Sequence, residues 1–402
     1  MRLAKNKLLF LALYKLLFLA LFCNNMHVYA TIIDNRYFPL YQKIFPRTLD
    51  RRSFCELDLF FSSSKDALNK HHETIGLPEI YGTFDQRILS SAIELTEKQN
   101  PLRIDLRNST NIPWKTSGKI TSEGFNLYLE KSLNDYLSLG FNTGLMHVDS
   151  RIIFNPTTQP IYLDNQRRAA LNLLSLQAPQ WNDTQLLDSE LFIKVGKIWE
   201  YSLKTRRLDL NAQFGFIFPT SLKRDINNPA SIPFGGNGHK GITGSISLDT
   251  ELKDDLSFGI SVLFNKRFPK SDTQRLSLLE EPYIYGAVIE SARVSPGLTI
   301  GLSPYLIAQG LYDGLGAYIR YIYIHHLCDS WSINRGRKNI PANLKTVIST
   351  SQWTSEYFSF NIFYDFNQYS RASVVIDIPV DLLGARLNSK TYRVSLGCET
   401  SF

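Results

Sequence analysis

From about residue 117 to the C-terminus, hydrophobic residues alternate with small or polar ones in one segment after another. In a typical segment, Phe258, Ile260 and Val262 occupy every second position, and Gly259 and Ser261 stand between them. Successive side chains of a β-strand point to opposite faces, so each segment has an apolar face and a polar one. The pattern therefore predicts an all-β fold for most of the chain.

Two all-β architectures produce this alternation, a soluble sandwich and a transmembrane barrel. The strands of a sandwich are usually about five to six residues long. Many segments of this chain alternate for about nine residues or more, which is the length that a tilted strand needs to cross a bilayer. Their polar faces favour Gly, Ser and Asn with scattered charges, which suits a water-filled interior. We therefore expect a closed antiparallel transmembrane β-barrel.

Short and long connections alternate between the expected strands. The short connections occupy residues 132–135, 202–207, 253–255, 309–313 and 367–371. The long, irregular connections occupy residues 150–188, 219–240, 266–296 and 327–352. Outer-membrane barrels show this rhythm, with the short turns facing the periplasm. A sandwich has no reason to follow it.

The expected strands from residue 117 onward number eleven, whereas bacterial barrels contain an even number of strands. A further strand must therefore precede them. Residues 54–62 fit best, with Leu57 and Phe61 facing outward and Asp58 facing inward. Residues 103–107 are a weaker candidate, and using both with one more partner would give fourteen strands. We expect about twelve strands, within a range of 10–14.

The first thirty residues have the features of a secretory signal peptide. A basic start is followed by an apolar stretch over residues 8–22, and cleavage is expected between Ala30 and Thr31. This stretch is too short for a transmembrane anchor and is interrupted by Lys15. We therefore divide the chain into a cleaved signal (1–30), an N-terminal region with the first strand (31–116) and the main part of the barrel (117–402).

Removal of this signal changes the charge of the chain. The chain has 44 basic and 37 acidic residues, and the signal holds four of the basic and none of the acidic ones. The mature chain is thus close to neutral, so its charge gives no support to nucleic-acid binding. The remaining cysteines, Cys55, Cys328 and Cys398, do not have the spacing of metal ligands. No metal and no other cofactor is predicted.

The last eight residues resemble the assembly signal that ends Gram-negative outer-membrane β-barrel proteins. Ser395 is the polar residue of that signal, Gly397 follows two places on, and Phe402 is the terminal aromatic residue. Thr400 departs from the pattern, which usually has a hydrophobic residue there. The resemblance implies transit through the periplasm, insertion into the outer membrane by the barrel-assembly machinery, and pairing of the last strand with the first. Outer-membrane lipid and this machinery are the expected partners.

Charged residues on the expected inward faces are the first candidates for functional residues. They are Glu130, Lys194, Asp209, Asp249, Glu251, Arg320, Asp365, Asp377, Arg393 and Glu399. One interpretation is that these charges bias which ions and solutes pass through the lumen. The alternative is a structural network of paired charges across neighbouring strands. Because both signs are present, only weak charge selectivity is expected.

Two helices are expected outside the regular strands. The first spans Asp85 to Lys98 and places Ile88, Ala92 and Leu95 on one side. It is either a plug in the lumen or a short helix packed on a rim or in an external loop. The second spans residues 164–177 and either covers the barrel mouth or packs locally within its loop.

We find no firm catalytic or metal-binding motif. The run 147–150 contains His, Asp and Ser, but it lacks the His-x-Ser spacing of outer-membrane phospholipases, and we expect it at the edge of a loop. The adjacent histidines at 71–72 and 325–326 would point to opposite faces of a strand, so neither pair can form a joint metal site. The glycine-rich run 235–238 lacks the strand-to-helix context of a phosphate cradle.

The predicted function is an outer-membrane pore or passive transporter of small solutes, with selectivity set by lumen polarity and by occlusion. One alternative resembles the long-chain fatty-acid transporters, which have fourteen strands and an N-terminal hatch and carry hydrophobic substrates. Further alternatives are an outer-membrane hydrolase and a structural or adhesive surface barrel with a blocked lumen. The main prediction is therefore a protein that is not an enzyme.

Overall fold

The computed structural model describes residues 34–40, 53–96, 111–155, 161–176, 179–201, 207–253, 255–333 and 342–402. The predicted signal peptide, with its cleavage site between Ala30 and Thr31, lies outside the described residues. The weaker strand candidate at residues 103–107 lies outside them as well.

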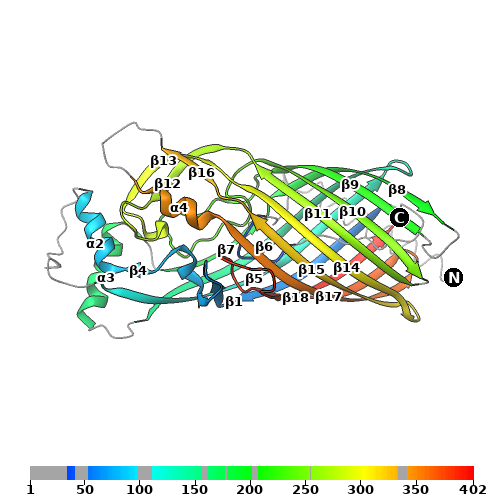
Figure 1. The fold of residues 1–402 in the computed structure, drawn as a ribbon, viewed down its shortest axis with the longest axis horizontal. Helices are drawn as coiled ribbons and strands as arrows, with labels where there is room; N and C mark the ends of the chain where they lie inside the picture. The colour runs from blue at the N-terminus through cyan, green and yellow to red at the C-terminus, as the bar shows by residue number, and fades with distance from the viewer. Residues whose placement is uncertain are drawn as a thin grey trace.

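Twelve of the described strands form one closed antiparallel sheet (Figure 1). Their bounds are β1 (Phe54–Ser64), β5 (Pro113–Ser132), β6 (Leu137–Asn155), β8 (Ser189–Glu200), β9 (Arg207–Phe218), β10 (Gly241–Lys253), β11 (Leu256–Arg267), β14 (Leu298–Tyr312), β15 (Leu315–His326), β17 (Trp353–Asn367), β18 (Ser370–Pro379) and β19 (Tyr392–Ser401). The ring closes because β5 pairs with both β1 and β6, and β19 pairs with β1. These pairings confirm the predicted barrel, its strand number, its first strand and the pairing of the last strand with the first.

The two faces of each strand differ in polarity as the alternation predicts. On β1, Leu57, Leu59 and Phe61 are 40–51% exposed, whereas Asp58 and Phe60 are buried. Exposed hydrophobic side chains continue around the outside of the ring, for example at Phe214 and Ile362. In water such a surface would be unfavourable, but it matches the hydrocarbon around a transmembrane barrel.

One end of the barrel, which we call the turn end, carries the short connections. The link between β17 and β18 lies where it was predicted. The turn predicted at residues 309–313 begins too early, because β14 continues through a register shift to Tyr312, and only Asp313 of the predicted range lies in the turn. The actual turn uses Asp313 and Gly314, both of which have positive φ angles. Glycine adopts that conformation readily, which explains why the chain reverses there.

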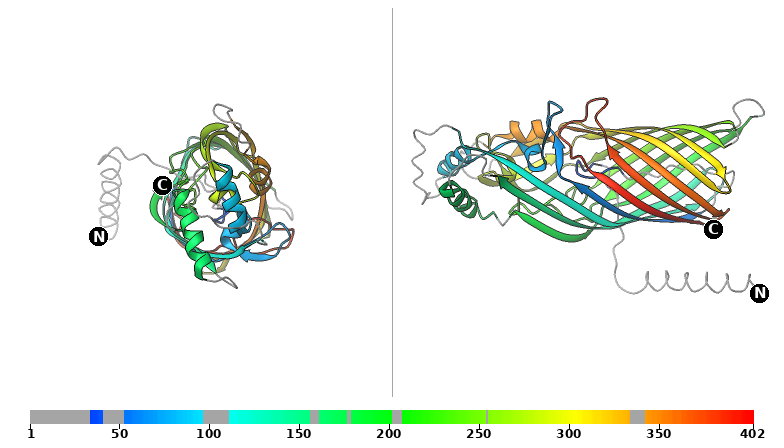
Figure 2. Two further views of the ribbon diagram at one scale, coloured as in Figure 1. Left: turned by 90° about the vertical axis from the view of Figure 1, so that its left-hand side faces the viewer. Right: turned by 90° about the horizontal axis from the view of Figure 1, so that it is seen from below.

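The opposite end, the loop end, carries structured rather than irregular connections. They contain β2 (Asp66–Leu68), β3 (Thr74–Gly76), η1 (Leu77–Tyr81), β4 (Phe84–Asp85), α2 (Gln86–Leu95), α3 (Ile161–Leu173), β7 (Gln180–Leu186), β12 (Lys270–Leu276), η3 (Tyr283–Tyr285), β13 (Val288–Ser295), β16 (Ser330–Ile333) and α4 (Leu344–Ser351). Buried side chains of η1, α2, α3 and η3 share one large hydrophobic cluster with inward residues of β5 and β6. Figure 2 shows α2 and α3 lying next to each other across this end of the barrel.

The first predicted helix forms as α2, with the Asp85 side chain accepting hydrogen bonds from two backbone N–H groups of the first turn. Leu89, Ala92 and Ile93 are buried, whereas Leu95, predicted on the same side as Ala92, is 55% exposed. The buried face of α2 therefore includes Ala92 of the predicted side but not Leu95. In Figure 1, α2 lies beyond the ends of the barrel strands, as the rim-packing alternative expects, and not in the lumen.

Among the helices that the structure describes, none is both long and apolar enough to cross a membrane.

Candidate functional site

Residues 34–40, which we call the crossing segment, lie inside the barrel near its loop end. The Asp34 carboxylate binds Arg267 at the end of β11, and the carbonyl of Leu40 accepts a hydrogen bond from Arg393 near the start of β19. β11 and β19 are five strands apart in the ring of twelve, so they stand on nearly opposite walls. The side chains of Tyr37, Phe38 and Leu40 are buried. The crossing segment therefore bridges the lumen.

At its first residue the crossing segment is held by charge. The Nε and Nη2 atoms of Arg267 donate to the two carboxylate oxygens of Asp34 at 2.8 and 3.0 Å. The Nη1 atom of Arg267 lies 2.7 Å from a carboxylate oxygen of Asp188, in the break between β7 and β8. Asp188 also accepts hydrogen bonds from Ser221 and from the N–H of Gly236. One buried arginine thus neutralises two buried carboxylates.

The glycine-rich run 235–238 has a positioning role at this ion-pair network. A Cβ atom at Gly235 would lie 2.4 Å from the Asp188 carboxyl group, and one at Gly236 would lie 2.4 Å from the Arg267 guanidinium. No other residue type leaves room for these contacts. The glycines allow the β9–β10 connection, residues 219–240, to approach the network closely.

Toward Leu40, the crossing segment is held through its backbone carbonyls. The Thr391 hydroxyl donates to the carbonyl of Tyr37 at 2.6 Å. Two guanidinium N–H groups of Arg393 donate to the carbonyls of Pro39 and Leu40, each at 3.2 Å. These bonds do not depend on which side chains the crossing segment carries at these positions.

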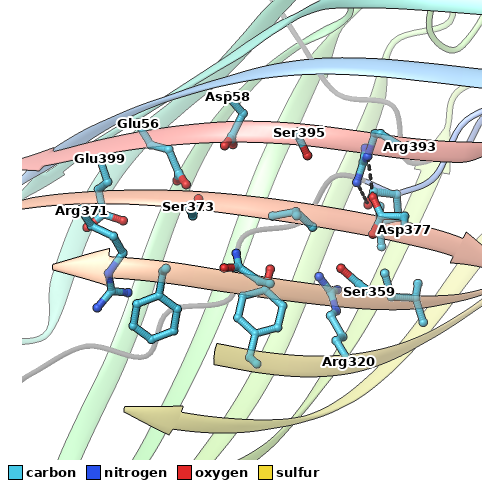
Figure 3. A pocket seen from close by; sticks show the side chains of 16 residues that line it. Glu56, Asp58, Arg320, Ser359, Arg371, Ser373, Asp377, Arg393, Ser395 and Glu399 are labelled. Carbon is cyan, nitrogen blue, oxygen red and sulfur yellow. Dashed lines mark hydrogen bonds and ion pairs between the residues drawn. The ribbon is translucent and has the colours of Figure 1, made fainter. Parts of the chain in front are cut away.

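A polar cavity of about 60 Å³ extends from Leu40 toward the turn end (Figure 3). Its charged lining comes from four strands: Glu56 and Asp58 of β1, Arg393 and Glu399 of β19, Arg371 and Asp377 of β18, and Arg320 of β15. Ser359 and Asn361 of β17 add uncharged polar groups. Four of the predicted lumen charges, Arg320, Asp377, Arg393 and Glu399, are therefore brought together. Gly397 leaves space there, because a Cβ atom would lie 2.3 Å from the Asp58 carboxyl group.

Several charges of this cavity are paired across neighbouring strands. Arg393 donates to Asp377 at 2.6 Å, and the two residues are register partners on β19 and β18. Arg371 binds Asp365 with two hydrogen bonds of 2.6 and 3.0 Å between β18 and β17. Arg320 donates to the Ser303 hydroxyl at 3.0 Å. The lining thus combines both signs with internal pairing.

Asp365, on β17, pairs with Arg371 as described above. The remaining predicted lumen charges lie on strands that do not line this cavity: Glu130 of β5, Lys194 of β8, Asp209 of β9, and Asp249 and Glu251 of β10. The Nζ atom of Lys194 lies 3.6 Å from the Oε2 atom of Glu130, and the Nη2 atom of Arg207 lies 3.5 Å from the Oδ2 atom of Asp209. The hydroxyl of Tyr305 donates to Asp249. These residues form a second group that does not line the cavity below Leu40.

The run 147–150 lies within β6, so the predicted loop edge is wrong. Ser150 is buried, whereas His147 and Asp149 are partly exposed on the opposite face of the strand. The His147 ring bonds the Thr184 hydroxyl at 2.8 Å. These three residues therefore do not converge as a catalytic triad would.

The comparisons with known proteins give similarity of fold. No protein-family model matches the sequence, and no curated protein matches it. Among solved structures, the chain is similar to the COG4313 outer membrane channel from Pseudomonas putida F1, with 11% identity, a TM-score of 0.49, and coverage of 90% of this chain and 100% of that chain. It is also similar to the transport unit of the autotransporter AIDA-I from Escherichia coli (9% identity, TM-score 0.41, 90% and 93% covered). A third is a FadL homologue from Pseudomonas aeruginosa (12% identity, TM-score 0.31, 88% and 91% covered).

Proposed function

We propose that the chain is a bacterial outer-membrane channel for small solutes, closed by the crossing segment and opened when that segment leaves its contacts. The observation that carries the proposal is the bridge of residues 34–40 from Arg267 on one wall to Arg393 on the other. Because the cavity below contains charges of both signs, we expect weak discrimination between anions and cations.

The outer surface supports a membrane location. Large hydrophobic side chains such as Ile193, Phe214 and Leu306 are 41–57% exposed on it. A closed ring leaves no strand edge with unpaired N–H and C=O groups, which is the condition for β-structure in hydrocarbon. Both features fit a barrel that spans a bilayer.

The anchoring of the crossing segment supports a removable closure. The segment contributes no strand to the ring of twelve, so its departure breaks no hydrogen bond between barrel strands. Its anchors are polar groups of Arg267, Thr391 and Arg393. Polar anchors can exchange partners with water. Opening must also release the packing of Tyr37, Phe38 and Leu40, which belong to hydrophobic clusters.

Single-channel conductance in planar bilayers tests the proposal. The mature chain is compared with a variant in which residues 34–40 are replaced by an equal number of Gly and Ser residues. A matched control carries the same type of replacement in the exposed turn between β2 and β3, which does not touch the lumen cavity. We expect a higher and steadier conductance only when the crossing segment is replaced.

The opposite outcomes would contradict the proposal. An absence of current in both folded proteins would favour the structural or adhesive surface barrel. Equal currents in both would mean that residues 34–40 do not close the path.

A further inference from the structure

A second cavity, of about 160 Å³, lies on the loop-end side of the crossing segment. We call it the outer cavity. Its aromatic walls are Tyr37, Tyr81, Tyr283, Trp331 and Trp353. Two arginines, Arg36 of the crossing segment and Arg224 of the β9–β10 connection, also line it. The outer cavity is thus rich in aromatic residues, unlike the cavity below Leu40, and its lining also includes Asp34 and Asp329.

The guanidinium of Arg224 meets aromatic rings in place of a carboxylate. It lies 5.3 Å from the ring centre of Tyr283 and 5.7 Å from that of Tyr81. Its Nε–H group is buried and has no acceptor among the residues that the structure describes. An arginine stays charged at any physiological pH, so this donor remains in place and unused.

Arg36 and Trp331 add further donors to the same walls. The guanidinium of Arg36 lies 5.7 Å from the ring centre of Tyr81, and its described acceptors are the neutral carbonyls of Thr350 and Ser351. The Nε1–H group of Trp331 is buried and, within the described part of the chain, has no acceptor. Buried donors without acceptors are unfavourable, and an oxygen-rich ligand would satisfy them.

The carboxylates that line the outer cavity already have partners. Asp34 uses both oxygens for Arg267. Asp329 accepts from the N–H of Gly297 at 2.8 Å and faces the His326 ring at 3.1 Å. Neither is paired with Arg224, so the unused Nε–H group of Arg224 remains available to a ligand.

A second arginine that lies over aromatic rings differs from Arg224 because it has a carboxylate partner. Arg167 in α3 also lies over aromatic rings, 4.1 Å from the centre of Phe154 and 5.2 Å from that of Trp114. However, Arg167 is paired with Asp164 at 2.5 Å. Arg167 therefore has a carboxylate partner, whereas the buried Nε–H group of Arg224 has no acceptor among the described residues.

We propose that the outer cavity binds a small carboxylate that carries a flat apolar ring. The carboxylate accepts from Arg224 and Trp331, and the ring packs against Tyr283 and its aromatic neighbours. The volume agrees, because a cavity of roughly 150 Å³ accommodates one benzene ring. The inference goes beyond the channel function, since it concerns binding at the loop end and not passage through the lumen.

Calorimetric titration of the folded mature chain in detergent tests the site with benzoate as the probe. Benzamide keeps the ring and removes the charge, and cyclohexanecarboxylate keeps the charge and removes the flat ring. We expect benzoate to bind at least about tenfold more tightly than benzamide, and cyclohexanecarboxylate to bind more weakly than benzoate. Equal affinity for benzoate and benzamide, or no measurable binding of benzoate, would overturn the proposal without use of any variant.

Two matched variants locate the site. Arg224→Gln is expected to weaken benzoate binding at least about tenfold, whereas Arg167→Gln is expected to leave it unchanged. Trp331→Phe, which removes one donor and keeps a ring, should weaken it less. If the Arg167 and Arg224 variants lose benzoate affinity equally, or if neither loses any, benzoate does not bind at Arg224. A failure of the channel proposal would appear as an absence of bilayer current and would leave these affinities unaffected.

Discussion

The two ends of the crossing segment are fastened to opposite walls by different chemistry. At the first end, Asp34 forms a buried ion pair with Arg267, which is shared with Asp188. Toward the other end, Thr391 and Arg393 donate to backbone carbonyls. The first attachment depends on the identity of one side chain in the segment, whereas the second needs only its backbone.

This difference indicates which end is released first. When Asp34 leaves, Arg267 still has Asp188 as a counter-ion, so no buried charge on the wall is left unpaired. Removing a partner from a buried ion pair is otherwise strongly unfavourable. The shared arginine therefore makes the Asp34 end suitable for reversible detachment, while Arg393 keeps its own pair with Asp377 in either state.

The largest effect is expected from Arg267→Gln. The substitution leaves two buried carboxylates, Asp34 and Asp188, without their cation. Losing a buried pair partner costs roughly 3–5 kcal/mol, so both the crossing segment and the β9–β10 connection should loosen. A lower midpoint of thermal unfolding together with a higher open fraction in bilayers would agree. A variant as stable and as closed as the parent would show that the network does not hold the segment.

A smaller and more selective effect is expected from Asp34→Asn. This change leaves the pair between Arg267 and Asp188 in place, so the open fraction should rise with little change in thermal stability. Asp272→Asn is the matched control, because its ion pair with Lys223 is on the surface, where such pairs contribute little. If Asp34→Asn and Asp272→Asn change the open fraction equally, the ion pair of Asp34 does not hold the crossing segment in its closed position.

Thr391→Val tests the carbonyl end and should act more weakly still. It removes the hydroxyl that donates to Tyr37 and keeps a similar shape. A neutral hydrogen bond contributes about 0.5–1.5 kcal/mol, and the two bonds from Arg393 remain. We expect a slight rise in the open fraction. An effect larger than that of Asp34→Asn would reverse the proposed order of release.

The smallest effect is expected from acidification, through His239 beside the Asp34 end. Burial lowers the pKa of His239 below its usual 6.5, and the charges of Arg267 and Lys270 lower it further. The hydrogen bond to the Phe268 carbonyl raises this pKa but only partly offsets the lowering. A histidine with a lowered pKa stabilises the fold fully above its unfolded pKa and loses this contribution as the pH falls toward the folded value. The open fraction should therefore rise modestly between about pH 7 and 5. His239→Gln should remove this rise, and His71→Gln, in the exposed β2–β3 turn, should not.

Much of the wall could be predicted because hydrocarbon outside and water inside impose a two-residue period on every strand. Leu57 and Asp58, for example, face opposite sides for this reason alone. The same reasoning found the first strand without any long-range information. It began the turn between β14 and β15 too early, because the register shift in β14 looks locally like a chain reversal.

The closure could not be predicted in the same way. Asp34 and Arg267 are 233 positions apart, and the bonds from Arg393 to the crossing segment span more than 350. Residues 34–40 show no periodic alternation of hydrophobic and polar positions, so the local sequence does not predict where they lie. Asp188 lies in the break between β7 and β8, where the alternation of a strand is interrupted as well. The structured loop end was also missed, since its short strands and helices are stabilised by contacts with one another and not by their own patterns.

A reversible cross-link between the crossing segment and the wall tests the central claim most directly. The N–H of Ser389 donates to the carbonyl of Arg36 at 3.1 Å, so the two backbones are as close as neighbouring strands, a spacing that a disulfide can bridge. The substitutions Arg36→Cys and Ser389→Cys are combined with Asp34→Asn, and Cys55, Cys328 and Cys398 are replaced by Ser. Detachment of Asp34 alone leaves residues 36–40 on the β19 wall, and the channel opens fully only when these residues leave as well. We therefore predict that full single-channel openings disappear on oxidation and return after reduction. Openings that persist in the fully cross-linked protein would show that residues 34–40 do not close the lumen.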